Sequence, residues 1–85
     1  MSSTKHEKII NLHLKFAEDR GTDKTYCPSE VARKIYPDDW RPKMDLVRQV
    51  ADTLVESGKL VVLQNGRKID DKPSEATGPI RLRKP

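Results

Sequence analysis

The first third of the chain carries a helical pattern of apolar positions. Between about Thr4 and Asp19, apolar side chains and one histidine recur three and four residues apart, which places them on one face of a helix. These positions are Ile9, Ile10, His13, Leu14, Phe16 and Ala17. Thr4 followed by Glu7 fits a capping box, although Ser3 could also cap, and Gly21 stands just past the end, where helices favour glycine. We therefore predict a helix over residues 4–19.

A polar connection over residues 20–27 precedes a second, shorter apolar pattern. Its last part, Thr25–Cys27, could form a short extended piece, and Pro28 suits the first turn of a helix, where its missing N–H is not needed. The apolar face consists of Val31, Ala32 and Ile35. Pro37 ends the segment, because the residue before a proline avoids the helical region. We predict a helix over residues 28–36.

The third apolar pattern is the broadest. Asp38 or Asp39 can cap its start, Pro42 is tolerated only in a first turn, and Gly58 marks the stop after Ser57. One arc of the predicted helix holds Met44, Leu46, Val47, Val50, Ala51, Leu54 and Val55, and the opposite arc holds Arg41, Asp45, Arg48, Gln49, Asp52 and Glu56. We expect Trp40, at the start of this helix, to anchor the core where the three helices meet.

After Gly58 the pattern changes to that of strands. Residues 59–64 form a β-branched run, and Asn65-Gly66 is a turn signal because both residues tolerate positive φ. Residues 67–69 can continue as a second extended piece, and residues 70–78 read as a loop. Residues 80–83 alternate apolar and basic side chains, as a half-buried antiparallel strand does.

This order of elements predicts an α+β fold: a winged helix-turn-helix with three helices and a small antiparallel β-sheet, whose C-terminal β-hairpin is the wing. The 85 residues fit a single domain. The longest apolar run, Leu60–Leu63, is far too short for a membrane span, and the first residues lead into no signal-peptide hydrophobic region. One cysteine cannot form an internal disulfide, so we expect a cytoplasmic protein.

Four segments carry a resemblance to a known family: Thr25–Arg33, Asp38–Arg41, Gly58–Leu60 and Gly78–Arg81. Over about residues 9–83 the chain resembles a family of small, mostly bacterial proteins catalogued as a domain of unknown function (number 3253). The Cys27–Ala32 and Gly78–Arg81 segments together are fairly specific. The resemblance implies a winged-helix-like fold and supplies no activity, substrate or catalytic residue.

Charge directs the functional interpretation to nucleic acid. The net charge is +4, but residues 37–58 carry −2 whereas residues 59–85 carry +4. We expect binding of double-stranded DNA, in a role in transcriptional regulation, with contacts led by the wing and supplemented by the third helix. The candidate residues are Arg41, Lys43, Arg48 and Gln49 on that helix, Arg67 and Lys68 beside the Asn-Gly turn, and Arg81, Arg83 and Lys84 on the last strand.

Alternatives remain open at this point. Arg41, Asp45, Arg48 and Asp52 alternate in sign, which is typical of an ion-paired, solvated helix face. The domain could then be an adaptor that binds a protein partner and no nucleic acid. Trp40 and Tyr26 could stack on single-stranded bases, although we expect Trp40 in the core.

Enzymatic chemistry has little support. Cys27 before a helix could sense redox state, but a small residue packed between the first two helices is the favoured interpretation. His6 and His13 lie two turns apart, too far to share an ion. We therefore expect no catalytic residue, no metal and no cofactor.

Overall fold

The computed structural model describes residues 4–85, with side chains from Lys5 onward. Its helices are α1 (Thr4–Arg20), α2 (Pro28–Ile35), the 3-10 turn η1 (Arg41–Lys43) and α3 (Met44–Glu56). Its strands are β1 (Val61–Gln64), β2 (Arg67–Ile69) and β3 (Arg81–Arg83). The cap predicted at Ser3 or Thr4 lies outside the residues whose side chains are described.

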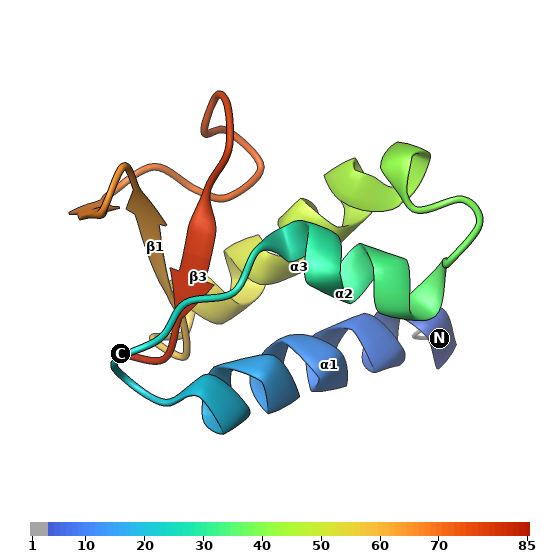
Figure 1. Cartoon of the computed structure of the whole chain (residues 1–85), viewed down its shortest axis with the longest axis horizontal. Coiled ribbons are helices and arrows are strands. Elements are labelled where there is room, and N and C mark those ends of the chain that lie inside the picture. Colours follow the sequence, from blue (N-terminus) through green and yellow to red (C-terminus); the bar gives the residue numbers. More distant parts are fainter. Residues whose placement is uncertain (1–3) are drawn as a thin grey trace.

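The three strands form one antiparallel sheet with β1 in the centre, in the order β2-β1-β3 (Figure 1). The hairpin between β1 and β2 turns at Asn65 and Gly66, whose φ angles of 53° and 79° are those that the Asn-Gly signal predicts. Tyr26 extends the sheet by one antiparallel bridge to Leu82 of β3. The α+β fold with three helices and a small antiparallel sheet is thus confirmed.

The third helix begins later than predicted. Asp38 and Asp39 lie in a turn, closed by an N–H of Asp39 that donates to the carbonyl of Tyr36 at 3.2 Å, and neither caps α3. Pro42 supplies no N–H and restricts the residue before it, so the chain makes one 3-10 turn before the α-helix starts at Met44.

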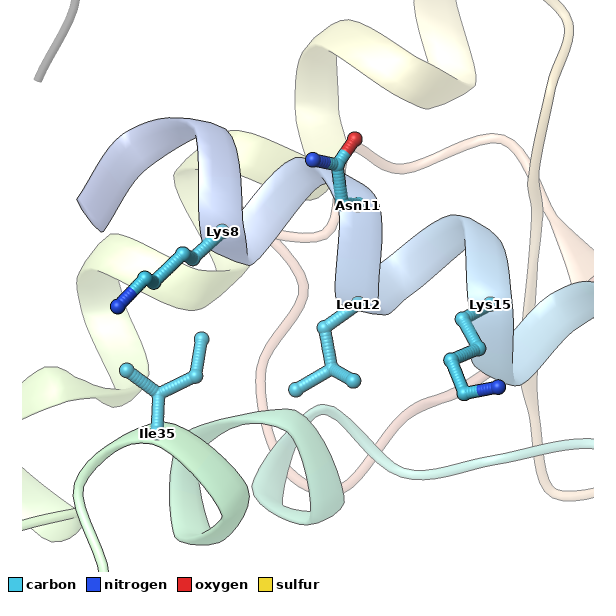
Figure 2. A pocket seen from close by; sticks show the side chains of 5 residues that line it. All are labelled: Lys8, Asn11, Leu12, Lys15 and Ile35. Carbon is cyan, nitrogen blue, oxygen red and sulfur yellow. The ribbon is translucent and has the colours of Figure 1, made fainter. Parts of the chain in front are cut away.

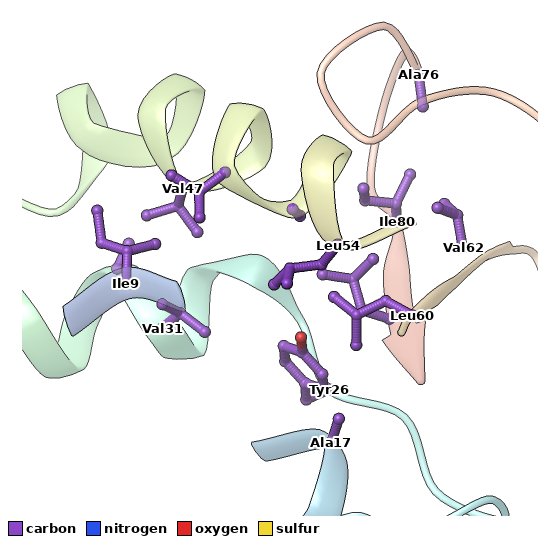
Figure 3. Close-up of a cluster of buried hydrophobic side chains, with 14 residues drawn as sticks. Ile9, Ala17, Tyr26, Val31, Val47, Leu54, Leu60, Val62, Ala76 and Ile80 are labelled. Atoms are coloured by element: carbon purple, nitrogen blue, oxygen red, sulfur yellow. The ribbon is translucent and has the colours of Figure 1, made fainter. Parts of the chain in front are cut away.

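The core lies between the helices and the inner face of the sheet (Figure 3). Its members come from α1, α2, α3, β1, β3 and the segments beside them. They include Ile9, Ala17, Val31, Val47, Val50, Ala51, Leu54, Leu60, Val62, Ile80 and Leu82. The expectation that Trp40 anchors this core is wrong: Trp40 is only partly buried, and the fully buried aromatic ring is Tyr26.

Backbone pairing explains the burial of Tyr26. Its N–H donates to the carbonyl of Leu82 at 2.9 Å, and its carbonyl accepts the N–H of Leu82 at 2.7 Å. This pairing fixes Tyr26 as a strand residue that faces inward, where its ring stacks on Phe16 with centroids 5.5 Å apart. Tyr26 is therefore not available as a stacking platform for bases.

Within residues 4–85 no helix has the length and apolar composition needed to cross a membrane.

Candidate nucleic-acid interface

The loop that follows β2 is fastened to the outer face of α3. The guanidinium of Arg48 donates to the carbonyl oxygens of Ala76 at 3.1 Å and Gly78 at 2.9 Å, with a longer contact to Pro73. One turn further along α3, the carboxylate of Asp52 accepts the backbone N–H and the hydroxyl of Ser74. Arg48 therefore holds the loop in place, with its guanidinium N–H groups directed to backbone carbonyls.

The same contacts correct the expected charge pattern on α3. Asp52 bonds to Ser74 and Arg48 bonds to carbonyls, so neither takes part in the predicted row of ion pairs. Within the described residues the ion pair on this face joins Glu56 to Lys72 of the loop at 3.2 Å. Asp45 and Gln49 remain exposed on α3. The face available for base reading is acidic, and Gln49 is its remaining neutral candidate.

The cations of the last strand bind the segment between α1 and α2. Arg81 donates to the hydroxyl and carbonyl oxygens of Thr25 at 2.9 and 3.2 Å, and Arg83 donates to the carbonyl of Thr22 at 2.7 Å. Lys84 pairs with Glu18 at 2.8 Å. Figure 1 shows β3 and η1 toward opposite ends of the molecule, so these cations do not join Arg41 and Lys43 in one site.

Arg67 and Lys68 form a third group. Both are exposed on β2, which is an edge strand of the sheet beside the Asn65-Gly66 turn. The nine residues predicted from the sequence therefore do not form one site, although the register that pairs Leu63 with both Lys68 and Arg81 places these two cations on the same face of the sheet.

The densest group of cations and aromatic rings lies where α2 meets η1. The guanidinium carbons of Arg33 and Arg41 lie 4.2 and 5.1 Å from the centroid of the Trp40 ring. Nearby, the ammonium groups of Lys5 and Lys43 each lie 5.3 Å from the centroid of the Tyr36 ring. We call this group the cationic corner; its members are Lys5, Arg33, Tyr36, Trp40, Arg41 and Lys43.

Stacking on a ring restrains a guanidinium and leaves its N–H groups directed along the ring plane, free to bind an anion. Asp38 and Asp39 share a shallow hollow with Trp40 and Arg41, and they reduce the positive potential of the corner. Arg41 and Lys43 are among the candidates predicted from the sequence, whereas Arg33 and Lys5 are not. The available signal was local density, because residues 33–43 contain four basic and two aromatic side chains.

A buried histidine links two helices and Tyr26 by hydrogen bonds. His13 is fully buried, and its Nε2 lies 3.0 Å from the carbonyl oxygen of Val47 while its Nδ1 lies 2.8 Å from the hydroxyl of Tyr26. Since a carbonyl oxygen only accepts, Nε2 carries the proton and donates to Val47, and Nδ1 accepts the Tyr26 hydroxyl. Burial lowers the pKa of His13 to about 4, an effect that the bond to Val47 partly opposes. At neutral pH this imidazole is an uncharged link between α1, α3 and Tyr26.

A second network organises the start of α2. Glu30 accepts the backbone N–H of Cys27 at 2.8 Å and a guanidinium N–H of Arg20 at 2.6 Å, while Arg20 also donates to the carbonyl of Thr25 at 2.9 Å. Burial alone would raise the pKa of Glu30, but these hydrogen bonds hold that pKa below its ordinary value.

The thiol of Cys27 is half-buried beside this network. Its Sγ accepts the hydroxyl of Ser29 at 3.1 Å. Across residues 4–85, no three side chains of the types His, Cys, Asp and Glu are grouped so that they could hold a metal ion.

The structure defines a small α+β protein with three helices and a three-stranded antiparallel sheet. The chain belongs to the family described as "Protein of unknown function (DUF3253)", whose family model matches residues 6–85. This match agrees with the resemblance noted from the Cys27–Ala32 and Gly78–Arg81 segments. A comparison with curated proteins finds no match.

Proposed function

We propose that the protein binds double-stranded DNA as a winged helix-turn-helix domain, with the cationic corner as its principal contact. The observation that carries this proposal is the stack of Arg33 and Arg41 on Trp40 at the junction of α2 and η1. In helix-turn-helix proteins the first helix of the motif crosses the DNA backbone, and the N-terminal residues of the second contact base edges. Under this proposal α2, which carries Arg33, would be the first helix, and Arg41 in η1 would lie just before the second, α3.

The topology supports the same interpretation. The chain runs through α1, the Tyr26 bridge, α2 and α3, and the sheet then pairs β3 with both β1 and Tyr26. Residues 65–80 would be the wing, and its exposed cations Arg67 and Lys68 would provide a second phosphate contact. The cationic corner, and not the wing, is therefore the proposed principal DNA contact. The cations Arg81, Arg83 and Lys84 already bind residues 18–25.

The mode of binding follows from the charges on α3. The carboxylates of Asp45, Asp52 and Glu56 lie on the helix that would enter the major groove, and they would repel phosphates. We therefore propose a predominantly phosphate-contacting, salt-sensitive complex in which Arg41, Lys43 and Gln49 supply limited base contacts.

The test is fluorescence anisotropy with a mixed-sequence duplex of about 20 base pairs at several salt concentrations, starting from about 50 mM. Replacing two phosphate contacts should lower the slope of log K against log salt by about 2. We expect this for the double variant Arg33→Gln/Arg41→Gln. The matched control is Lys24→Gln/Lys59→Gln, which removes two exposed positive charges elsewhere and should change the slope much less.

Two results would contradict the proposal. The first is an absence of duplex binding at the lowest salt concentration, which would favour the alternative function of a protein-interaction module. The second is an equal loss of affinity in both double variants, since that would reflect net charge and not the corner.

A further inference from the structure

A second surface, between α1 and α2, combines partly exposed apolar side chains with positive charge. It consists of two adjoining hollows of about 290 and 190 Å³ that share Leu12 and Lys15. Figure 2 shows Leu12 of α1 and Ile35 of α2 pointing into the space between the helices, with Lys8 and Lys15 on either side of Leu12. We call this surface the α1–α2 groove; its lining residues are Lys8, Asn11, Leu12, Lys15, Phe16, Asp19, Lys34 and Ile35.

The groove exists because α1 carries more apolar side chains than the core can cover. Ile9, His13 and Ala17, four residues apart, face the core and are buried. Leu12 and Phe16, also four residues apart, lie one position to the side and stay half-exposed beside α2. Apolar side chains left together in a hollow with a polar rim are typical of a protein-interaction site.

The positive charge around the groove favours an acidic ligand. Lys8, Lys15 and Lys34 are exposed around the apolar floor. Asp19 is the acidic residue of the lining, and its pairing with Lys15 at 3.6 Å is between side chains that are 61 and 71% exposed. Such an exposed pair is weak, so an acidic ligand can replace Asp19 as the partner of Lys15.

The length of the groove suits a ligand that is an α-helix. From Lys8 to Asp19 the groove follows α1 for about 16 Å, or three helical turns. An amphipathic helix that lies in such a groove buries apolar anchors at positions i, i+4 and i+7. The apolar floor of Leu12, Ile35 and the part of Phe16 that is not covered by Tyr26 and Arg20 offers contacts for such anchors.

A second copy of this chain does not meet these requirements. Its acidic helix, α3, keeps its large apolar side chains Val47, Val50 and Leu54 buried in its own core. Nucleic acid would use the lysines but gain nothing from the apolar floor.

We propose that the α1–α2 groove docks an acidic amphipathic helix of a partner protein. This site is separate from the cationic corner, because successive residues of α2 point in different directions: Arg33 lies over Trp40, whereas Lys34 and Ile35 line the groove. The proposal does not depend on DNA binding.

The experiment uses a designed helical peptide of about 14 residues, with leucines at i, i+4, i+7 and i+11 and mainly glutamates elsewhere. The control peptide has the same composition with its leucines spread around the helix. Amide chemical shifts of the isotope-labelled protein are followed during titration with each peptide. We expect the patterned peptide to shift resonances of residues 8–19 and 34–35, and the control peptide to bind much more weakly.

Charge reversal then tests the rim. Lys15→Glu/Lys34→Glu should weaken binding of the patterned peptide about tenfold or more, and Lys24→Glu/Lys59→Glu should weaken it less than about threefold. The proposal is overturned if no binding occurs, if both peptides or both double variants behave alike, or if the shifts map elsewhere. Shifts of the same residues with protein concentration alone would also overturn it, because the groove would then bind a second copy.

Discussion

The buried histidine should make the stability of this protein depend on pH in a way that one substitution can isolate. His13 is enclosed by α1, α3 and Tyr26, and both of its ring nitrogens are hydrogen-bonded in the neutral state. Protonation would place a charge in the core and leave Nδ1–H facing the Tyr26 hydroxyl, which would have to reverse its role from donor to acceptor.

The size of the effect follows from two pKa values. The folded protein holds the pKa of His13 at about 4, compared with 6.5 for an unperturbed histidine. Between these values the unfolded chain binds the proton and the folded protein does not, so stability is complete above pH 6.5 and falls as the pH drops toward 4. At about 1.4 kcal/mol per pKa difference of one, the loss is about 3 kcal/mol. That is a large part of the ~5–10 kcal/mol typical of a small domain.

The assay is urea unfolding of the native protein and of His13→Gln at pH values from 7.5 to 4. Glutamine keeps a polar group at this position but does not titrate, and all other titratable residues are the same in both proteins. The free-energy advantage of the native protein over the variant should therefore shrink by about 3 kcal/mol across this range. A constant difference in unfolding free energy between the two proteins at all pH values would refute the reasoning. A His13 imidazole that titrates near pH 6.5 by NMR would refute it as well.

Three further substitutions test the contacts of the fold. Arg48→Ala should cost about 1–2 kcal/mol and speed amide exchange at residues 73–78, whereas its exposed neighbour Gln49→Ala should stay within about 0.5 kcal/mol; equal exchange in both would contradict the fastening of the loop. Glu30→Ala removes the bond to the Cys27 N–H and should lower the melting temperature by about 4–8 °C; an unchanged melt would argue against this network. Because Trp40 is only partly buried, Trp40→Ala should cost about 1–2 kcal/mol and keep a cooperative melt, while Tyr26→Ala should cost about 3–5 kcal/mol; the reverse order would restore Trp40 as the core aromatic.

The secondary structure was largely predictable because its signals are local. Apolar periodicity located the three helices, and Asn65-Gly66 located the hairpin turn at positive φ. The start of α3 was not predictable in the same way. Asp38 and Asp39 are good caps in isolation, but Pro42 imposes a 3-10 turn before the α-helix. The capping preference of Asp38 and Asp39 and the backbone restriction of Pro42 predict different helix starts, and local propensity alone does not decide between them.

The burial of aromatic residues depended on pairing distant in sequence. Trp40 has the greater apolar area, but Tyr26 is the residue whose backbone pairs with Leu82, and that bridge directs its ring inward. The residues next to Tyr26 in the sequence do not predict with which strand its backbone will pair.

The candidate site was the least predictable part. Formal charge identified nine residues, but it could not show that Arg48 would bind loop carbonyls or that Arg81 and Arg83 would bind Thr25 and Thr22. A guanidinium that satisfies backbone carbonyls and one that awaits a phosphate look the same in a sequence. Arg33 was missed because its partner Trp40 lies across the turn between two elements.

The pairing of Tyr26 with β3 also sets the order in which this chain can fold during synthesis. Thr25 and Arg81, which hydrogen-bond to each other, are 56 residues apart, and Leu82 completes the surroundings of Tyr26. A ribosome that has released α1, α2 and α3 has released a helical cluster whose central ring still lacks its covering strand. The apolar surroundings of Tyr26 therefore stay incomplete until residues 81–83 have been synthesised, because Leu82 cannot cover them earlier.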